Sequence, residues 1–275
     1  MKGQEHLLAM NRIEELNRLL SFDSETGLPN KNKCMRDVLE LKEGAVFFIS
    51  VRNFTDINSA YGREIGDRMI VRIANALRGL EDAFGMQLYK FSGTEYALIG
   101  NRETILERAL IACPARSGDN CGACDTCKWK TVLSEGQDKE DGNFPCSMRA
   151  IADKIQTFLR IIDIPINGHA IHINFSVGGA YGSARDVIHS AQIANKECSI
   201  VGKPVIYDGV LGQRVMEEHN RNFEWIDRLK RAIQEGGIVP YFQGIRDNST
   251  GEIHKFEALA RMELGDQTFA PYLFL

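Results

Sequence analysis

The chain has 275 residues, of which 44% are hydrophobic and 25% are charged, and its formal net charge is −4. This composition is typical of a folded globular protein, and the weak acidity gives no electrostatic reason to expect a nucleic-acid partner. No stretch is apolar and long enough to span a bilayer, and acidic residues interrupt the first 20 positions. We therefore expect no signal peptide, no membrane segment and a cytoplasmic location.

Leucine and isoleucine recur with a helical period over residues 4–20, which predicts a helix. Two roles fit it: packing on its own domain, or acting as a stalk through which two copies dimerise. The run is too short for sustained heptads to decide between them. The segment Ser21–Asn30 then ends the helix, with Gly27 and Pro29 as helix-breaking residues.

Apolar periodicity predicts the elements of the next 90 residues. A nearly all-apolar strand, Ala45–Val51, is expected to be covered on both faces. A polar turn around Gly93 separates two apolar runs, which predicts a β-hairpin whose tip carries one carboxylate, Glu95. The helices expected around these strands are Lys31–Leu41, Asp56–Tyr61, a long amphipathic helix that opens at Gly66 and Asp67, and Arg102–Ala112.

Residues 113–147 break this pattern, because they are polar, rich in glycine and without hydrophobic period. They hold five of the seven cysteines: Cys113, Cys121, Cys124, Cys127 and Cys146. A long insertion of this kind needs an explanation. The C-x2-C-x2-C spacing lets thiolates converge on one zinc ion, which would fold a loop without a core, and it also suits an iron–sulfur cluster.

Two alternatives to a metal remain for this insertion: a disordered loop with free thiols, or oxidative disulfides. We expect the other two cysteines, Cys34 and Cys198, to be buried structural thiols.

After the insertion the sequence again predicts alternating elements. These are a helix at Met148–Ile162, a strand at His169–Tyr181, a helix at Ala184–Glu197 and a strand at Pro204–Tyr207. The mixture indicates an α/β (α+β) fold with a central, mostly antiparallel sheet flanked by helices. A charged helix, Val210–Glu235, then links to strands at Ile238–Ile245 and Glu252–Ala260.

Several spaced motifs resemble the GGDEF (diguanylate cyclase) family. They are Asp23–Asn30 (DSETGLPN), Phe54–Gly62 (FTDINSAYG) followed by Gly66-Asp67, Ser92–Tyr96 (SGTEY) at the place of G-G-D-E-F, Ser176–Gly178, and Asn195-Lys196. The resemblance runs through about residues 20–208. It implies a nucleotidyl-cyclase-like fold and a site for GTP or cyclic di-GMP.

The same resemblance implies a metal site that has lost its acids. The family's metal-binding carboxylates fall on Ser50, Arg52 and Thr94, which leaves Glu95, and a phosphate-contacting lysine falls on Thr55. Mg²⁺ prefers carboxylate oxygens, so we expect no Mg²⁺ here and no cyclase activity.

Nucleotide recognition is less altered. The family's guanine-binding Asn and Asp fall on Asn58 and Asp67, and Lys196 would meet phosphate. The alternatives are that Asn58 is a turn residue, that Asp67 is a helix N-cap and that Lys196 is simply solvated. The family's inhibitory R-x-x-D site falls on Ala83 and Met86, so we expect no product feedback there.

The last stretch resembles the opening of an EAL domain, the cyclic di-GMP phosphodiesterase barrel. The motifs are Tyr241–Ile245 (YFQGI, with Gly244 in place of Pro) and Gly251–Arg261, which contains Glu257-Ala-Leu. The resemblance implies that Glu257 is a metal ligand and that Gln243 and Arg261 contact substrate. Only the opening is present, so we expect a truncated barrel that is inactive by itself.

These observations predict four segments: an N-terminal helix (1–22), a degenerate GGDEF domain (23–208), a linker helix (209–235) and an EAL fragment (236–275). The leading hypothesis is a regulatory module that binds GTP and modulates a C-terminal EAL phosphodiesterase. The alternatives are an active diguanylate cyclase with an altered metal site, and a sensor or interaction module built on the Cys loop.

Overall fold

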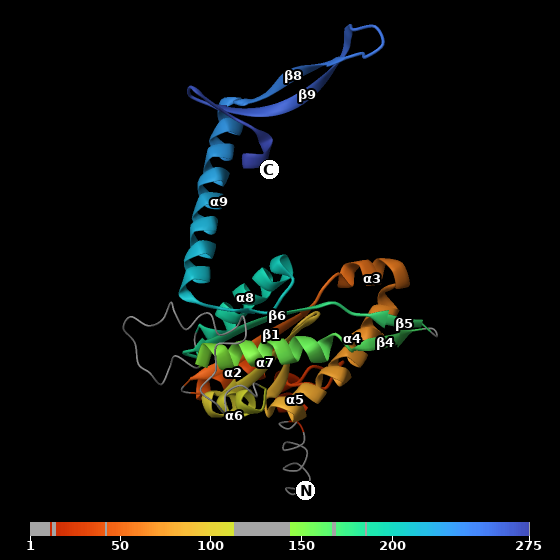
Figure 1. Ribbon diagram of the computed structural model, residues 1–275, viewed down its shortest axis with the longest axis vertical. Coiled ribbons are helices and arrows are strands. Elements are labelled where there is room, and N and C mark those ends of the chain that lie inside the picture. Colours follow the sequence, from red (N-terminus) through yellow and green to blue (C-terminus); the bar gives the residue numbers. More distant parts are fainter. Residues whose placement is uncertain are drawn as a thin grey trace, which may run out of the picture. The chain divides into compact units, whose positions relative to one another are not determined.

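The computed structural model describes residues 12, 15–41, 43–112, 144–166, 169–184 and 186–274 (Figure 1). The chain divides into two compact units, one ending at Asp208 and one beginning at Gly209. Among the described helices, none combines the length and hydropathy that crossing a bilayer requires. Most of the predicted Cys-rich insertion lies outside the described residues, including Cys113, Cys121, Cys124 and Cys127.

The first unit is built on a five-stranded sheet with the order β2-β3-β1-β6-β7. Its strands are β1 (Gly44–Val51), β2 (Gln87–Ser92), β3 (Glu95–Asn101), β6 (Phe175–Gly182) and β7 (Val205–Ile206). Neighbouring strands are antiparallel, except that β6 and β7 run parallel. The mostly antiparallel sheet predicted from the sequence is therefore confirmed.

Strand β1 lies in the middle of the sheet, and its side chains alternate between two buried layers. Phe47 and Ile49 pack into one layer, whereas Val46 and Phe48 pack into the other. Helices cover both faces of the sheet in Figure 1. Two covered faces explain why β1 is apolar almost throughout.

The helices around this sheet include α2 (Lys31–Glu40), α3 (Phe54–Tyr61), α4 (Arg63–Leu77), α5 (Gly79–Phe84), α6 (Arg102–Ala112), α7 (Phe144–Leu159) and α8 (Val187–Val201). Met69 of α4 and Ile151 of α7 pack with Phe47, whereas Val38 of α2 and Ile188 of α8 pack with Phe48. Residues 15–21 are also helical, as predicted.

The predicted strand His169–Tyr181 is two strands. β5 (His169–His172) pairs with β4 (Asp163–Ile166) in a separate ribbon, and β6 begins only at Phe175. Residues 173 and 174 belong to neither strand, and the carbonyl of Asn174 accepts a hydrogen bond from the Arg52 N–H (2.7 Å). The sequence hides this break because Ile173 is still buried, so the inward alternation continues through it.

Helix α4 begins earlier than predicted. Its first residue is Arg63, and Gly62 is the N-cap, with a φ of +84° that favours glycine. Asp67 therefore lies inside the helix, and the alternative role of N-cap is wrong for it. The same Gly62 closes α3, so a single glycine joins the two helices.

The second unit contains α9 (Gly209–Glu235), β8 (Ile238–Arg246), β9 (Ile253–Leu264), β10 (Gln267–Phe269) and a 3-10 turn (Pro271–Leu273). The three strands form one antiparallel sheet in the order β10-β9-β8. Trp225 of α9 packs edge-to-face against Phe269, with ring centroids 5.2 Å apart. β10 was not predicted, because its three residues are too few to show a period.

Candidate functional site

The end of β1 is tied to helix α8 through one buried amide. Asn195 donates through Nδ2 to the carbonyls of Phe48 and Ser176, both at 2.8 Å. Its Oδ1 accepts from the hydroxyls of Ser50 (2.8 Å) and Ser176 (3.2 Å). The hydrogen-bonding capacity of this amide is therefore filled inside the fold.

The backbones of β6 and α8 approach very closely beside this amide. A Cβ built on Gly178 would lie 1.9 Å from the Asn195 nitrogen, so no side chain fits there. The Val177 N–H also donates to the Cys198 sulfur (3.2 Å). The Ser176–Gly178 and Asn195 motifs thus have a structural role, which their spacing alone did not reveal.

Arg52, two residues after Ser50, also faces α8. Its Nη2 donates to the carbonyl of Ser199 at 2.8 Å, in the last turn of that helix, where carbonyls lack intrahelical partners. Burial raises the pKa of the Cys198 thiol, and the nearby Arg52 charge partly offsets the increase. Cys34 and Cys198 are both buried and free, as predicted.

The predicted hairpin is confirmed, and Gly93 at its tip has a φ of +38°. Glu95 lies directly opposite Ser50 in the β1–β3 register. The Ser92 hydroxyl donates to the Glu95 carboxylate, and the Thr94 carbonyl accepts from the Val51 N–H (3.1 Å). The tip therefore holds its one carboxylate beside a hydroxyl.

A buried lysine lies beneath the same tip. The Lys90 ammonium donates to the Gly93 carbonyl and lies 4.6 Å from the centre of the Tyr96 ring. Burial lowers the pKa of Lys90, and the charges of Asp23, Glu25 and Glu95 oppose that shift. Sequence reasoning missed this lysine, because nothing in its neighbours marks a buried cation.

These residues do not fit a divalent metal. The positions implied by the family resemblance hold the Ser50 hydroxyl, the Arg52 guanidinium, Thr94 and one carboxylate, Glu95. Within the described ranges, no group of three or more His, Cys, Asp or Glu side chains could hold a metal ion. Mg²⁺ prefers several oxygen ligands with negative charge, which this arrangement does not supply.

The two residues predicted to contact guanine lie on neighbouring helices. Asn58 of α3 is half-buried, and its Oδ1 has no hydrogen-bond partner in the described part of the chain. A Cβ on Gly66 would lie 1.9 Å from that oxygen, so Asn58 packs against α4 one residue before the exposed Asp67. Lys196 is exposed on α8, next to Asn195.

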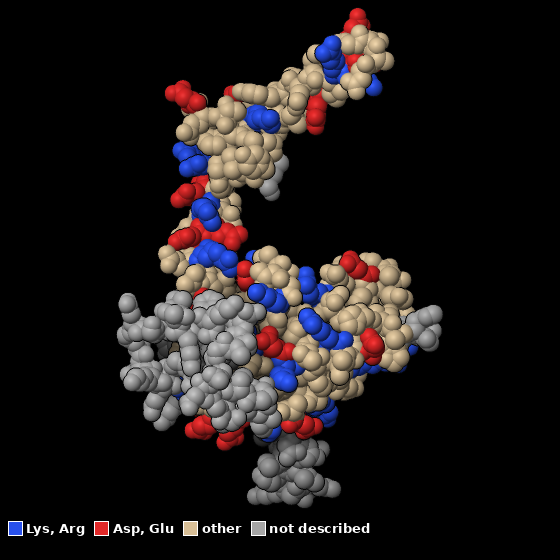
Figure 2. Space-filling view, in the orientation of Figure 1, with Lys and Arg blue, Asp and Glu red and all other residues tan. Residues whose placement is uncertain are grey.

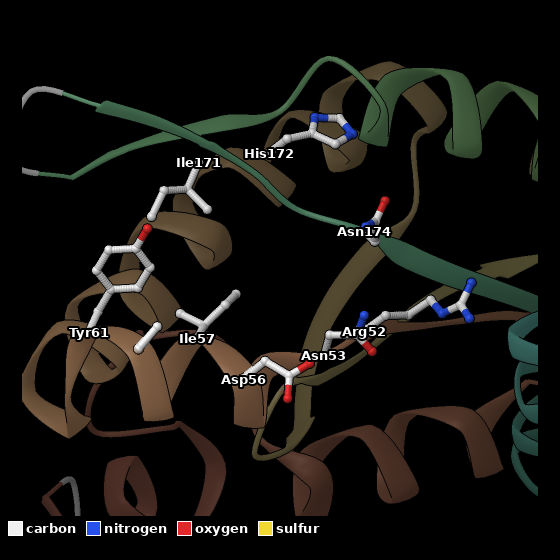
Figure 3. A pocket seen from close by; sticks show the side chains of 9 residues that line it. Arg52, Asn53, Asp56, Ile57, Tyr61, Ile171, His172 and Asn174 are labelled. Atoms are coloured by element: carbon white, nitrogen blue, oxygen red, sulfur yellow. The ribbon is translucent and has the colours of Figure 1, made fainter.

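A shallow pocket opens between α3 and the β5–β6 connection (Figure 3). Its wall is formed by Arg52, Asn53, Asp56, Ile57, Ala60, Tyr61, Ile171, His172 and Asn174. Asn53 caps α3 in the left-handed conformation (φ +56°), and in Figure 3 the Arg52 guanidinium points away from Tyr61 and His172. No sequence pattern predicted this pocket, because the residues of its two walls are far apart in the chain.

The residues predicted for the EAL fragment lie on the β8–β9 ribbon. Gln243 and Glu257 are cross-strand partners, and both are exposed. Arg261 lies 5.8 Å from the centre of the Tyr241 ring and donates to the carbonyl of Ala260 (2.8 Å). Neighbours on one face of a ribbon could share a ligand, but their assignment to an EAL site stays a prediction.

Comparison with known proteins supports the family resemblance of the first unit. The sequence model described as "Diguanylate cyclase, GGDEF domain" matches residues 20–109. The fold is similar to that of the coiled coil and GGDEF domain of DgcB from Caulobacter crescentus, solved in complex with c-di-GMP. That likeness has a TM-score of 0.52 and 14% identity, over 74% of this chain and 95% of that chain.

Two curated relatives match nearly the whole chain. The cyclic di-GMP phosphodiesterase PdeB of Shewanella oneidensis is 22% identical over 94% of this chain and 26% of its own length. The cyclic di-GMP phosphodiesterase PdeR of Escherichia coli is 21% identical over 94% of this chain and 34% of its own length. The chain thus spans about a quarter to a third of these relatives. The GGDEF family model thus matches residues 20–109, and the chain is similar in fold to a GGDEF domain.

Proposed function

We propose that this chain is a catalytically degenerate GGDEF module of a cyclic di-GMP signalling protein, which binds GTP and regulates a phosphodiesterase. The observation that carries the proposal is the hydrogen bonding of the two side chains at the end of β1. Ser50 is bonded to Asn195 and Arg52 to Ser199, where a cyclase would need carboxylates for its metal. Phosphoryl transfer depends on such metal ions to neutralise developing charge.

The guanine-binding part of the proposal rests on Asn58 and Asp67. Among the described residues, Asp67 is exposed and its side chain has no hydrogen bond or ion pair, so its carboxylate is available to a ligand. A carboxylate accepts hydrogen bonds from the N–H groups on one edge of guanine, which adenine does not offer in that pattern. Lys196 adds an exposed positive charge for phosphate.

The regulatory part of the proposal rests on the second unit and on the relatives. Both named relatives are phosphodiesterases that are longer than this chain, and the matches cover both units. Gln243, Glu257 and Arg261 carry the EAL resemblance directly after α9. A nucleotide bound to the GGDEF domain would change the activity of the phosphodiesterase only if it binds one conformational state of the protein more tightly than another.

Calorimetric titration with GTP and with ATP in a buffer containing Mg²⁺ tests the binding. We expect GTP to bind and ATP to bind at least about tenfold more weakly, and Asp67→Asn to weaken GTP binding by a similar factor. Asp82→Asn on α5 is the matched control, because it removes the same charge elsewhere. Absence of heat with millimolar GTP would contradict the proposal.

A second measurement addresses catalysis. Incubation with GTP and either Mg²⁺ or Mn²⁺, followed by chromatography, should yield no cyclic di-GMP. Appearance of cyclic di-GMP would show that the altered site is active and that the first unit is an enzyme.

A further inference from the structure

We infer that the guanine nucleotide binds this domain without a divalent cation, and that the Arg52 guanidinium supplies the positive charge that a metal supplies in a cyclase. This inference rests on the proposed function, because it concerns the same site. Its basis is that the side chains at the implied metal position are not the ligands that a divalent cation requires.

The charges around the β1 end do not suit a divalent cation. Glu95 is the one carboxylate at the implied metal position, and it accepts a hydrogen bond from a neighbouring hydroxyl. Arg52 brings a positive charge from the end of β1. The nearby ammonium of Lys90 is within electrostatic reach of Glu95 and also of Asp23 and Glu25, so it has carboxylates of its own. At the positions implied for the metal, one anion beside the Arg52 cation does not compensate a divalent ion.

The hydroxyl of Ser50 does not compensate for the missing acids. It donates to Asn195 Oδ1, and that oxygen is already shared with Ser176. The Ser50 oxygen keeps lone pairs, but it brings no negative charge to a metal, and its hydrogen bond to Asn195 ties it to α8. The fold therefore stabilises Ser50 as a structural donor and leaves a neutral group where the resembled family has a carboxylate.

The position of Arg52 suits a phosphate contact. Its side chain and that of Ser50 both reach α8, at Ser199 and Asn195 respectively. A guanidinium has five N–H donors, and in the described structure one of its nitrogens, Nη2, bonds to the Ser199 carbonyl. The remaining N–H donors can bind phosphate oxygens in pairs, and the hydrogen bond to Ser199 would fix the orientation of the guanidinium group.

Lys196 would provide the second cation for the same phosphate chain. It is exposed and follows Asn195 directly, and Asn195 is held by two hydrogen bonds to β1 and two to β6. The place of Lys196 beside the β1 end is thus set by a rigid contact. If Arg52 only stabilised the last turn of α8 through its hydrogen bond to Ser199, nucleotide binding without a metal would not be expected.

Calorimetric titration of the whole chain with GTP, in EDTA and in excess Mg²⁺, separates these roles. We expect dissociation constants that agree within about twofold between the two buffers. In EDTA, Arg52→Ala should weaken binding at least about tenfold, and Arg52→Lys by less, because it keeps the charge but loses the paired donors. Arg160→Ala at the end of α7 is the matched control and should leave binding unchanged.

Each outcome has a distinct meaning. Binding that requires Mg²⁺ would overturn the inference and leave the proposed function standing, whereas no binding in either buffer would overturn both. Unchanged binding by Arg52→Ala in EDTA would also overturn the inference. If circular dichroism shows that Arg52→Ala does not fold, Arg52→Gln gives the same comparison, because its amide can still donate to Ser199.

A converse variant tests the charge argument directly. Ser50→Asp combined with Arg52→Asp restores two carboxylates at the end of β1. We expect its GTP affinity to depend on Mg²⁺, with binding at least about tenfold weaker in EDTA than in Mg²⁺. Equal binding in both buffers would show that these two positions do not decide the metal dependence.

Discussion

At the scale of single residues, the β1 end shows how one hydroxyl completes a buried hydrogen-bond network. Asn195 is buried and bonded to two strands at once, and Ser50 is one of its partners. A buried polar group of this kind stabilises a fold only when its partners are all satisfied. The Ser50 hydroxyl therefore completes the Asn195 network.

The Asn195 network can be tested by a single substitution. Asn195→Ala removes both donors from the buried carbonyls of Phe48 and Ser176 and leaves the two serine hydroxyls without their shared acceptor. We expect the free energy of unfolding to fall by about 2–3 kcal/mol, measured by urea denaturation of the first unit's transition. The adjacent exposed Lys196→Ala, on the same helix, is the control and should cost less than about 0.5 kcal/mol. Equal losses in the two variants would contradict the network.

Residue-level features of the site were only partly predictable. Motif spacing located Ser50, Arg52 and Glu95 correctly at one end of the sheet, because strand register follows from the hairpin and from alternation. It did not reveal that Arg52 bonds to Ser199, since that contact joins residues far apart in the chain. It also missed Lys90, whose burial arises from packing rather than from sequence pattern.

At the scale of secondary-structure elements, long periodic segments were predicted well and short or interrupted ones were not. α2, β1 and α6 lie within a few residues of their expected bounds, and α2 and β1 owe this to buried residues that recur along them. The break between β5 and β6 was missed because Ile173 keeps the alternation, and β4 was missed because four residues carry too little pattern. A family resemblance adds no information about such local breaks.

The contact between β6 and α8 gives a prediction at this scale. Gly178→Ala would place a Cβ 1.9 Å from a backbone nitrogen of α8 and 2.5 Å from a backbone carbon, and backbone atoms cannot move aside as side-chain ends can. We expect the free energy of unfolding to fall by about 3 kcal/mol or more, read from thermal and urea denaturation. Gly209→Ala is the control, because its added Cβ would meet nothing within 4 Å and its φ is not positive. A mild effect at Gly178 would mean that α8 can shift away from the sheet.

At the scale of the whole molecule, the two units differ in how they bury their side chains. The first unit has apolar layers on both faces of its sheet, whereas in the second unit Leu211, Ala232 and Met262 are the buried apolar residues among those described. On the face shown in Figure 2, lysine, arginine, aspartate and glutamate are intermixed over the described residues of each unit. A three-stranded sheet with so small a core is expected to be much less stable than a five-stranded sheet covered by helices.

Hydrogen exchange on the whole chain tests this difference. Amides of β1 are paired on both sides, with β3 and β6, and they lie between two buried layers, so they should exchange only through large-scale unfolding. Phe242 and Phe256 on β8 and β9 are exposed, so this ribbon can open locally at little cost. We expect β8 and β9 amides to exchange on the order of 100-fold faster than β1 amides, measured by mass spectrometry of peptides from each strand. Saturating GTP should slow exchange near α3 and α4 if Asn58 and Asp67 hold the base. Protection of β8 and β9 equal to that of β1 would instead show that the ribbon is covered, and that the second unit is stabilised by contacts beyond its own core.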